Sequence, residues 1–123
     1  MYDSGTSTGG KRIAVRGGVW LQPVRSDRGS GGGGRNRACD PDPEVQAHRC
    51  LEIIVTALRE AGAGPEHVVR TRMFITDAAD ADAVGRAHGA IFVDVRPAST
   101  MVVVAGLLDP RWKVEIEAEA IVD

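Results

Sequence analysis

The chain has 123 residues, of which 43% are hydrophobic and 26% are charged, so it is long enough for one folded core and too short for two. This composition excludes wholesale disorder, and the net charge of −2 argues against a dedicated nucleic-acid binder. Charge is unevenly spread, however: residues 1–38 hold seven Lys/Arg against two Asp, a balance of +5, whereas residues 39–123 hold eight against fifteen acidic residues, a balance of −7. Any phosphate-binding surface is therefore expected in the first third.

The sequence shows no membrane span, no signal peptide and no recognisable metal-binding or catalytic motif. No apolar run approaches the ~18 residues of a membrane span, and the N-terminus lacks the pattern of a signal peptide, so we expect a cytoplasmic protein. Cys39 and Cys50 have no metal-ligand spacing and are expected to be free thiols. The spacing of His48, His67 and His88 predicts no metal site, and no phosphate loop or Ser/His/Asp arrangement is evident. We expect neither a metal nor a cofactor.

Residues 1–40 differ in composition from the rest of the sequence. They are expected to form an N-terminal hairpin and a Gly/Arg-rich mobile loop that belong to the same domain. Strand-like pieces at 12–15 and 19–21 flank Gly17-Gly18, which predicts a two-residue turn. Ten of the fifteen glycines precede position 35.

Poor order is expected over residues 25–37, because the entropy of glycine is not offset by buried apolar area. Arginine and glycine dominate this segment, which makes it a candidate for RNA contact, although it lacks aromatic residues for base stacking. An abnormal reading of residues 22–40, whose composition is that of a shifted frame in a GC-rich gene, is a further alternative.

Two helices are predicted in the body of the domain, residues 41–123. The first begins with Asp42 as N-cap and Pro43 in the first turn, and Gly62 ends it. Its buried face has helical spacing and comprises Leu51, Ile54, Val55 and Leu58, extended by Ala47 and Ala61. The second helix runs from about Asp80 to Phe92, and its inward residues are Val84, Ala87 and Ile91, with His88 as a further candidate.

Three strands are predicted around these helices. The first, 68–76, directs Val69, Thr71, Met73 and Ile75 to one face and Arg70, Arg72 and Phe74 to the other. Residues 99–105 are apolar on both faces and need cover on both sides. Residues 113–122 alternate strictly, with Val114, Ile116, Ala118, Ala120 and Val122 against Lys113, Glu115, Glu117, Glu119 and Ile121.

The element order is therefore β-β-α-β-α-β-β, a single α/β (α+β) domain with both helices packed on one face of the sheet. The other sheet face needs a partner, so an oligomer is expected.

Four pieces of residues 43–122 follow one another in a specific order and spacing: residues 58–63, 68–77, 96–104 (RPASTMVVV) and 114–118 (VEIEA). Together they resemble the RidA family, the YjgF-like reactive-intermediate imine deaminases also known as endoribonuclease L-PSP. The resemblance implies a chorismate-mutase-like fold and a homotrimer with clefts between its subunits. It also implies hydrolysis of 2-imino and enamino acids without a cofactor.

Carried over residue by residue, the resemblance places this chain in a subgroup that lacks the substrate-binding arginine. That arginine, which would bind a carboxylate bidentately, falls on Ser99. The carboxylate that orients the attacking water falls on Glu115, and a cysteine frequent in the family falls on Met101. Losing the bidentate contact costs several kcal/mol, at about 1.5–3 kcal/mol for each hydrogen bond to a charged group.

Three functions follow as hypotheses. The first is a trimeric protein that binds a small carboxylate or carbonyl metabolite in clefts between subunits, with weak or absent imine deaminase activity. The second is a 2-imino/enamino acid deaminase, a hydrolase using Glu115 as its catalytic residue. The third is an RNA-binding or endoribonuclease-like protein, for which nucleic acid is the less favoured partner.

The candidate substrate-binding residues are Ser99, Thr100, Met101, Arg72 and Arg96. Glu115 has a structural alternative, since side chains two apart on a strand recur every ~6.8 Å. Glu115, Glu117 and Glu119 therefore repel one another, and Arg70 and Arg72 are candidates to pair with them across the sheet.

Overall fold

The computed structural model describes residues 10–18 and 40–123, which form a four-stranded sheet with two α-helices. In chain order the elements are β1 (Lys11–Gly18), α2 (Pro43–Glu60), β2 (Val68–Ile75), α3 (Ala81–Phe92), β3 (Ala98–Val103) and β4 (Val114–Val122), with short 3-10 turns at Pro65–His67 and Ala78–Asp80. The predicted strand at 19–21, the loop at 25–37 and Cys39 lie outside the described residues.

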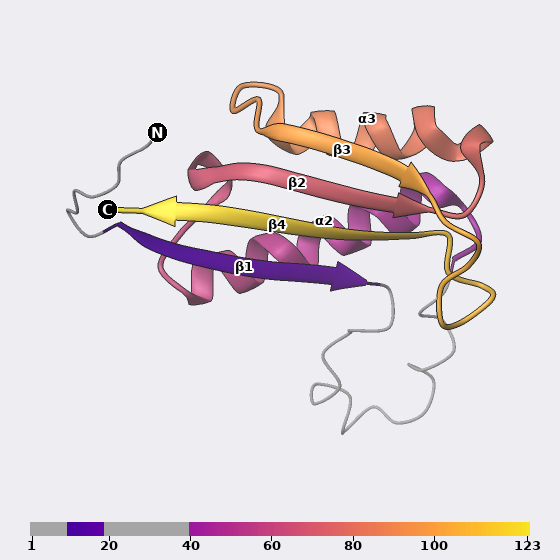
Figure 1. Cartoon of the computed structure of the whole chain (residues 1–123), viewed down its shortest axis with the longest axis horizontal. Helices are drawn as coiled ribbons and strands as arrows, with labels where there is room; N and C mark the ends of the chain where they lie inside the picture. The colour runs from indigo at the N-terminus through magenta and orange to yellow at the C-terminus, as the bar shows by residue number, and fades with distance from the viewer. Residues whose placement is uncertain (1–9, 19–39) are drawn as a thin grey trace.

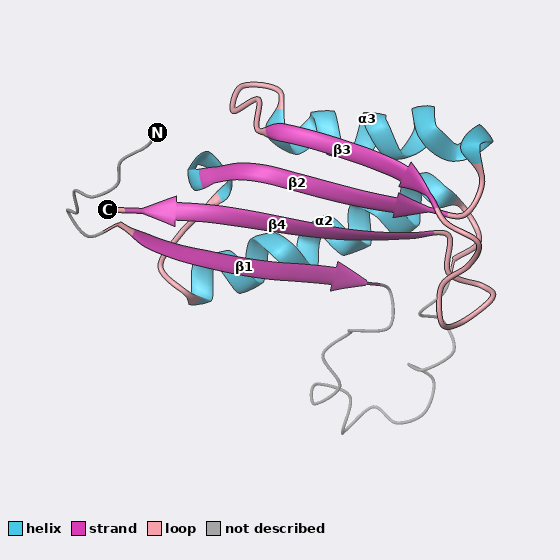
Figure 2. Ribbon diagram, in the orientation of Figure 1, coloured by secondary structure: helices cyan, strands magenta, loops and turns pink. Residues whose placement is uncertain are grey.

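The sheet has the strand order β1-β4-β2-β3. Strand β4 is antiparallel to both β1 and β2, while β3 pairs in parallel with β2. Both helices lie on the same side of this sheet (Figures 1 and 2). The predicted architecture, a mixed α+β domain with its helices on one face, is confirmed. No described element covers the opposite face of the sheet, which we call the open face.

Helix α2 follows the predicted signals at both ends. The side chain of Asp42 accepts a hydrogen bond from the backbone N–H of Glu44 at 2.8 Å, and Pro43 occupies the first turn. Gly62, just beyond the C-terminus, has a φ of 92°, a conformation that favours glycine. Leu51, Ile54 and Leu58 are buried against the sheet as the periodicity predicts.

The alternation of β4 also has the predicted consequence. Val114, Ile116, Ala118 and Ala120 are buried under the helices, whereas the intervening glutamates face the open side. Strand β2 departs from its prediction at one point, because an irregularity in its pairing with β4 falls between Val68 and Arg70. As a result Val68 is buried and Val69 is 43% exposed, so the prediction that Val69 lies with Thr71, Met73 and Ile75 on one face is wrong.

Gly17 and Gly18 belong to β1, and the predicted turn at these residues is wrong. Gly17 pairs with Ile116, and Gly18 pairs with Glu115. A Cβ atom at Gly17 would lie 2.1 Å from the backbone oxygen of Cys50. Glycine is therefore required here by the close approach of α2 to the sheet, and not by the geometry of a hairpin.

Cys50 lies at this contact as a core residue. It is a free, fully buried thiol whose sulfur is 3.7 Å from the carbonyl oxygen of Val114. Burial raises the pKa of the Cys50 thiol to about 12. The thiol therefore stays protonated at neutral pH, where a metal ligand or nucleophile would need the thiolate.

A buried glutamine fixes the start of β4 against the start of α2. Gln46 is 1% exposed. Its Nε2 donates to the carbonyl oxygens of Asp40 and Arg111 at 2.7 and 3.0 Å, and its Oε1 accepts from the backbone N–H of Lys113 at 2.7 Å. The loop before β4 is thereby tied to the first turn of α2.

Replacing Gly17 with alanine is expected to destabilise the domain by at least about 2 kcal/mol, because the new methyl group forces α2 away from β1. The matched control is Gly85→Ala in α3, where a Cβ atom meets nothing within 4 Å. That substitution is expected to raise stability by up to about 1 kcal/mol. Urea unfolding of the two variants measures both effects, and equal stabilities would contradict this account of the helix–strand contact.

Candidate functional site

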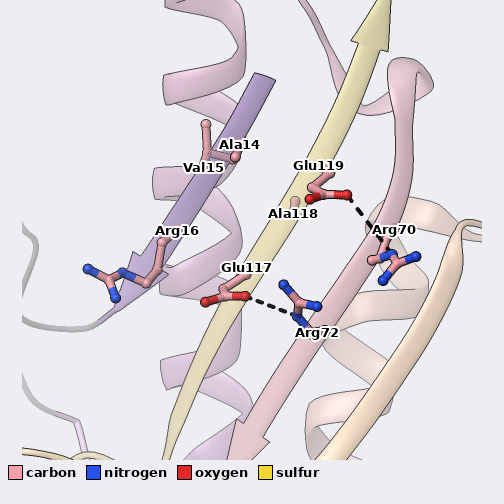
Figure 3. Close-up of a pocket in the computed structure, with 8 residues that line it drawn as sticks. All are labelled: Ala14, Val15, Arg16, Arg70, Arg72, Glu117, Ala118 and Glu119. Atoms are coloured by element: carbon pink, nitrogen blue, oxygen red, sulfur yellow. Dashed lines mark hydrogen bonds and ion pairs between the residues drawn. The ribbon is translucent and has the colours of Figure 1, made fainter. Parts of the chain in front are cut away.

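The open face of the sheet carries a row of glutamates on β4 between arginines of the neighbouring strands. On the β2 side, Arg72 Nε lies 3.1 Å from Glu117 Oε1, and Arg70 Nε lies 4.0 Å from Glu119 Oε1 (Figure 3). These pairs follow from the register, in which Arg72 is opposite Glu117 and Arg70 is opposite Glu119. The predicted pairing of Arg70 and Arg72 with the glutamates across the sheet is confirmed.

Strand β1 pairs with the same row from the other side. Arg16 Nε lies 3.4 Å from Glu115 Oε2, and Arg12 Nη1 lies 3.5 Å from Glu119 Oε1. A hollow of about 400 Å³ opens over this face, and its charged lining residues are Arg16, Arg70, Arg72, Glu117 and Glu119. Each described arginine of this face has a carboxylate partner, and Glu119 is shared by Arg12 and Arg70, so ion pairing offsets most of the positive charge that a phosphate or carboxylate would need.

Glu115 is the most enclosed of the three glutamates. Its side chain is 19% exposed, against 30% for Glu119 and 35% for Glu117. It lies opposite Phe74 on β2 and Gly18 on β1. The apolar ring on one side and the ion pair with Arg16 on the other give Glu115 surroundings that its two neighbours do not share.

Ser99 and Glu115 lie on opposite faces of the sheet within one chain. Ser99 on β3 pairs with Thr71, whose side chain is buried on the helix side, whereas Glu115 is on the open side. The two residues that the resemblance assigns to anchor and water handling therefore do not form a site in a single subunit.

The other candidate residues are divided between the same two faces. Thr100 pairs with Arg72, so both lie on the open side, while Met101 pairs with Met73 and packs against the core. Arg96 is exposed in the turn before β3 and has a positive φ of 55°. Its backbone N–H donates to the carbonyl oxygen of Phe92 at 2.9 Å, so this turn ends α3.

A chain of hydrogen bonds connects Ser99 to the interior. Thr71 Oγ1 lies 2.9 Å from Ser99 Oγ and 2.9 Å from His88 Nε2 on α3. Ser99 Oγ in turn donates to the carbonyl oxygen of Pro97 at 3.1 Å. Thr71, in the middle, is completely buried, while His88 is half-buried and Ser99 is exposed, so these hydrogen bonds connect a buried hydroxyl to the surface at Ser99.

His88 is held in a partly apolar environment. Its ring lies 4.7 Å from that of Phe92, and burial lowers the pKa of His88, so the ring is neutral at pH 7. Sequence reasoning placed Thr71 and His88 on inward faces without connecting them. Two polar residues on faces that are otherwise apolar were the available signal, since buried polar groups need partners.

Within residues 10–18 and 40–123, no three His, Cys, Asp or Glu side chains lie together in a way that would hold a metal ion. In the same part of the chain, no helix is both long enough and apolar enough to cross a membrane.

Comparison with known proteins gives consistent matches. A family model described as endoribonuclease L-PSP matches residues 29–122. The uncharacterized protein SCO2049 of Streptomyces coelicolor is 44% identical over 79 residues, which are 64% of this chain and 59% of that protein. The RutC family protein slr0709 of Synechocystis is 35% identical over 78 residues, 63% of this chain and 60% of that protein. The alignments thus span about three fifths of these curated relatives.

Solved structures resemble the fold as well. Rv2704 from Mycobacterium tuberculosis, described as a member of the YjgF/YER057c/UK114 family, is 41% identical with a TM-score of 0.66, and the match covers 68% of this chain and 70% of that one. PA3499 from Pseudomonas aeruginosa, a protein of unknown function, is 27% identical with a TM-score of 0.72 and covers 100% and 87% of the two chains.

Proposed function

The chain belongs to the endoribonuclease L-PSP family, which includes the YjgF and RidA proteins, and on this premise we propose that it is a RidA-like trimeric protein that binds a small carbonyl or carboxylate metabolite. The ligand binds in clefts between subunits, and imine deaminase activity is weak or absent. The observation that carries this proposal is the identity and environment of Ser99.

Ser99 offers a neutral hydroxyl where the resemblance expects a guanidinium. This hydroxyl is hydrogen-bonded to Thr71 and Pro97, and neither partner carries a charge. A substrate carboxylate held here would lack the charge-assisted bidentate contact that arginine provides. A site of this kind retains the capacity to bind a small polar molecule and loses much of its affinity for an imino acid.

The exposed edge of the sheet supports a trimer. Strand β3 has a protein partner on one side within the described chain, β2, and presents Val102 and Val103 at 40% and 57% exposure. An apolar edge strand next to an open sheet face is a surface that proteins usually cover. A neighbouring subunit at β3 would cover it and bring a second sheet close to Ser99.

Genuine imine hydrolysis is the second candidate, and the enclosure of Glu115 favours it. A carboxylate that is 19% exposed beside Phe74 is better suited to proton transfer than a fully solvated one. RNA binding has less support, because the described arginines of the open face are paired with glutamates and the basic segment 25–37 lies outside the described residues.

Light scattering tests the assembly. We expect a mass three times that of the 13.0 kDa chain at micromolar concentration. Val103→Glu, which places a charge on the exposed edge, is expected to shift the population toward monomer, whereas Val93→Glu, at a residue 62% exposed after α3, is the matched control. A stable monomer of the natural protein would refute the trimer and the clefts with it.

Hydrolysis of freshly generated 2-iminobutanoate tests the chemistry. We expect the natural protein to be slow and Ser99→Arg to gain activity, because the guanidinium supplies the missing carboxylate contact. Glu115→Gln in the Ser99→Arg background should abolish that gain, since an amide cannot take the proton from water.

Fast hydrolysis by the natural protein would favour the deaminase alternative, provided that Glu115→Gln removes it. Fast hydrolysis that is unchanged in Glu115→Gln would show that both residue assignments are wrong.

A further inference from the structure

The hydrogen bonds at Ser99 have a defined direction, which is set at the surface end. The carbonyl oxygen of Pro97 can only accept, so the contact at 3.1 Å uses the single hydrogen of the Ser99 hydroxyl. The contact between Ser99 and Thr71 at 2.9 Å must then use the hydrogen of Thr71. Thr71 therefore donates to Ser99.

The same reasoning determines which nitrogen of His88 carries the proton. The hydrogen of Thr71 is directed to Ser99, so the 2.9 Å contact with His88 Nε2 requires an N–H on that nitrogen. Since burial lowers the pKa of His88 and keeps the ring neutral, the ring is the Nε2–H tautomer. The three donors point in one direction, from the ring of His88 through Thr71 to Ser99 and Pro97.

This direction leaves Ser99 with a lone pair and no spare hydrogen. A hydroxyl can donate one hydrogen bond and accept two. Ser99 donates to Pro97, accepts from Thr71 and keeps one acceptor position, and it is the exposed member of the chain. A ligand group that donates a hydrogen bond meets a matching acceptor there. A carboxylate can only accept hydrogen bonds, so it makes none with this lone pair.

We propose that Ser99 accepts a hydrogen bond from the N–H of an uncharged carboxamide ligand and that Thr71 and His88 are positioning residues that enforce this preference over the corresponding carboxylate. The proposal rests on the proposed function, because it assigns the ligand group that lies at the same site. It narrows the ligand from carbonyl or carboxylate compounds to neutral carbonyl compounds that carry a donor.

Pyruvamide and pyruvate form a matched pair of probes, since they share one carbon skeleton. Pyruvamide carries a carboxamide, which can donate a hydrogen bond, where pyruvate carries a carboxylate, which can only accept one. Calorimetric titration of the full-length protein is expected to show at least about tenfold tighter binding of pyruvamide than of pyruvate. This factor corresponds to the one hydrogen bond that the amide makes to Ser99 and the carboxylate cannot make. In Ser99→Arg the order should reverse, because the guanidinium donates to the carboxylate.

Three variants separate the role of this chain of hydrogen bonds from the role of Thr71 in the fold. Thr71→Val removes one of the two hydrogen bonds that hold the Ser99 side chain in place. The serine hydroxyl can then rotate away from Pro97 and donate to a carboxylate, which should bring the ratio of the two affinities close to one. Thr71→Ser restores the hydroxyl and should restore the preference. Thr56→Val, the same change at an exposed position of α2, is the matched control and should leave the ratio unchanged. Thermal melting checks that each variant is folded.

The outcomes distinguish a failure of ligand binding from a failure of the ligand preference assigned to Ser99. If neither probe binds the natural protein, the proposed function fails and the assignment at Ser99 fails with it. If pyruvate binds as tightly as pyruvamide, or if Thr71→Val keeps the tenfold ratio, the direction of the chain does not select the ligand and this inference is overturned while ligand binding stands.

Discussion

The alternation of side chains along β4 is the constraint on which the rest of the structure depends. Its apolar residues form the centre of the core beneath both helices, and its glutamates form the row that the arginines of β1 and β2 flank. A shift of one residue in register would bury the glutamates and expose Ile116. Hydrogen bonds from the side chain of Gln46 to Asp40, Arg111 and Lys113 hold the chain at the point where this strand begins.

Those parts of the fold that follow from local pattern could be predicted from the sequence. The cap at Asp42, the helical spacing of Leu51, Ile54 and Leu58 and the alternation of β4 each reflect a preference that a short stretch of chain expresses alone. The errors arose where a distant contact decided the outcome. Gly17 is a glycine because the backbone of Cys50 presses against it, and nothing near Gly17 in the sequence indicates that neighbour.

Less of the candidate site than of the fold could be predicted from the sequence. The resemblance pointed to Ser99 and Glu115 and identified the missing arginine, but it did not show that the two residues occupy opposite faces of one subunit. The connection of Ser99 to His88 through Thr71 depends on how β2, β3 and α3 pack. Its direction depends further on Pro97, because one carbonyl oxygen fixes the hydrogen positions of three side chains.

If the site lies where the resemblance places it, a serine in place of a guanidinium gives that site a different chemistry. An arginine is a permanent cation with five donors, whereas the serine described here is neutral and has its hydrogen already engaged. The arginines on the open face do not compensate, since each is paired with a glutamate. Under the proposed function, a site built in this way would favour neutral ligands over anions.

The protonation of His88 provides the most direct test of this account. Nitrogen-15 NMR of the imidazole ring at pH 7 distinguishes a protonated Nε2 from a protonated Nδ1. We predict a neutral ring with the proton on Nε2, because the hydrogen of Thr71 is donated to Ser99. A neutral ring with its proton on Nδ1 would contradict it, since Thr71 would then donate to His88 and the hydroxyl of Ser99 would no longer be held as an acceptor.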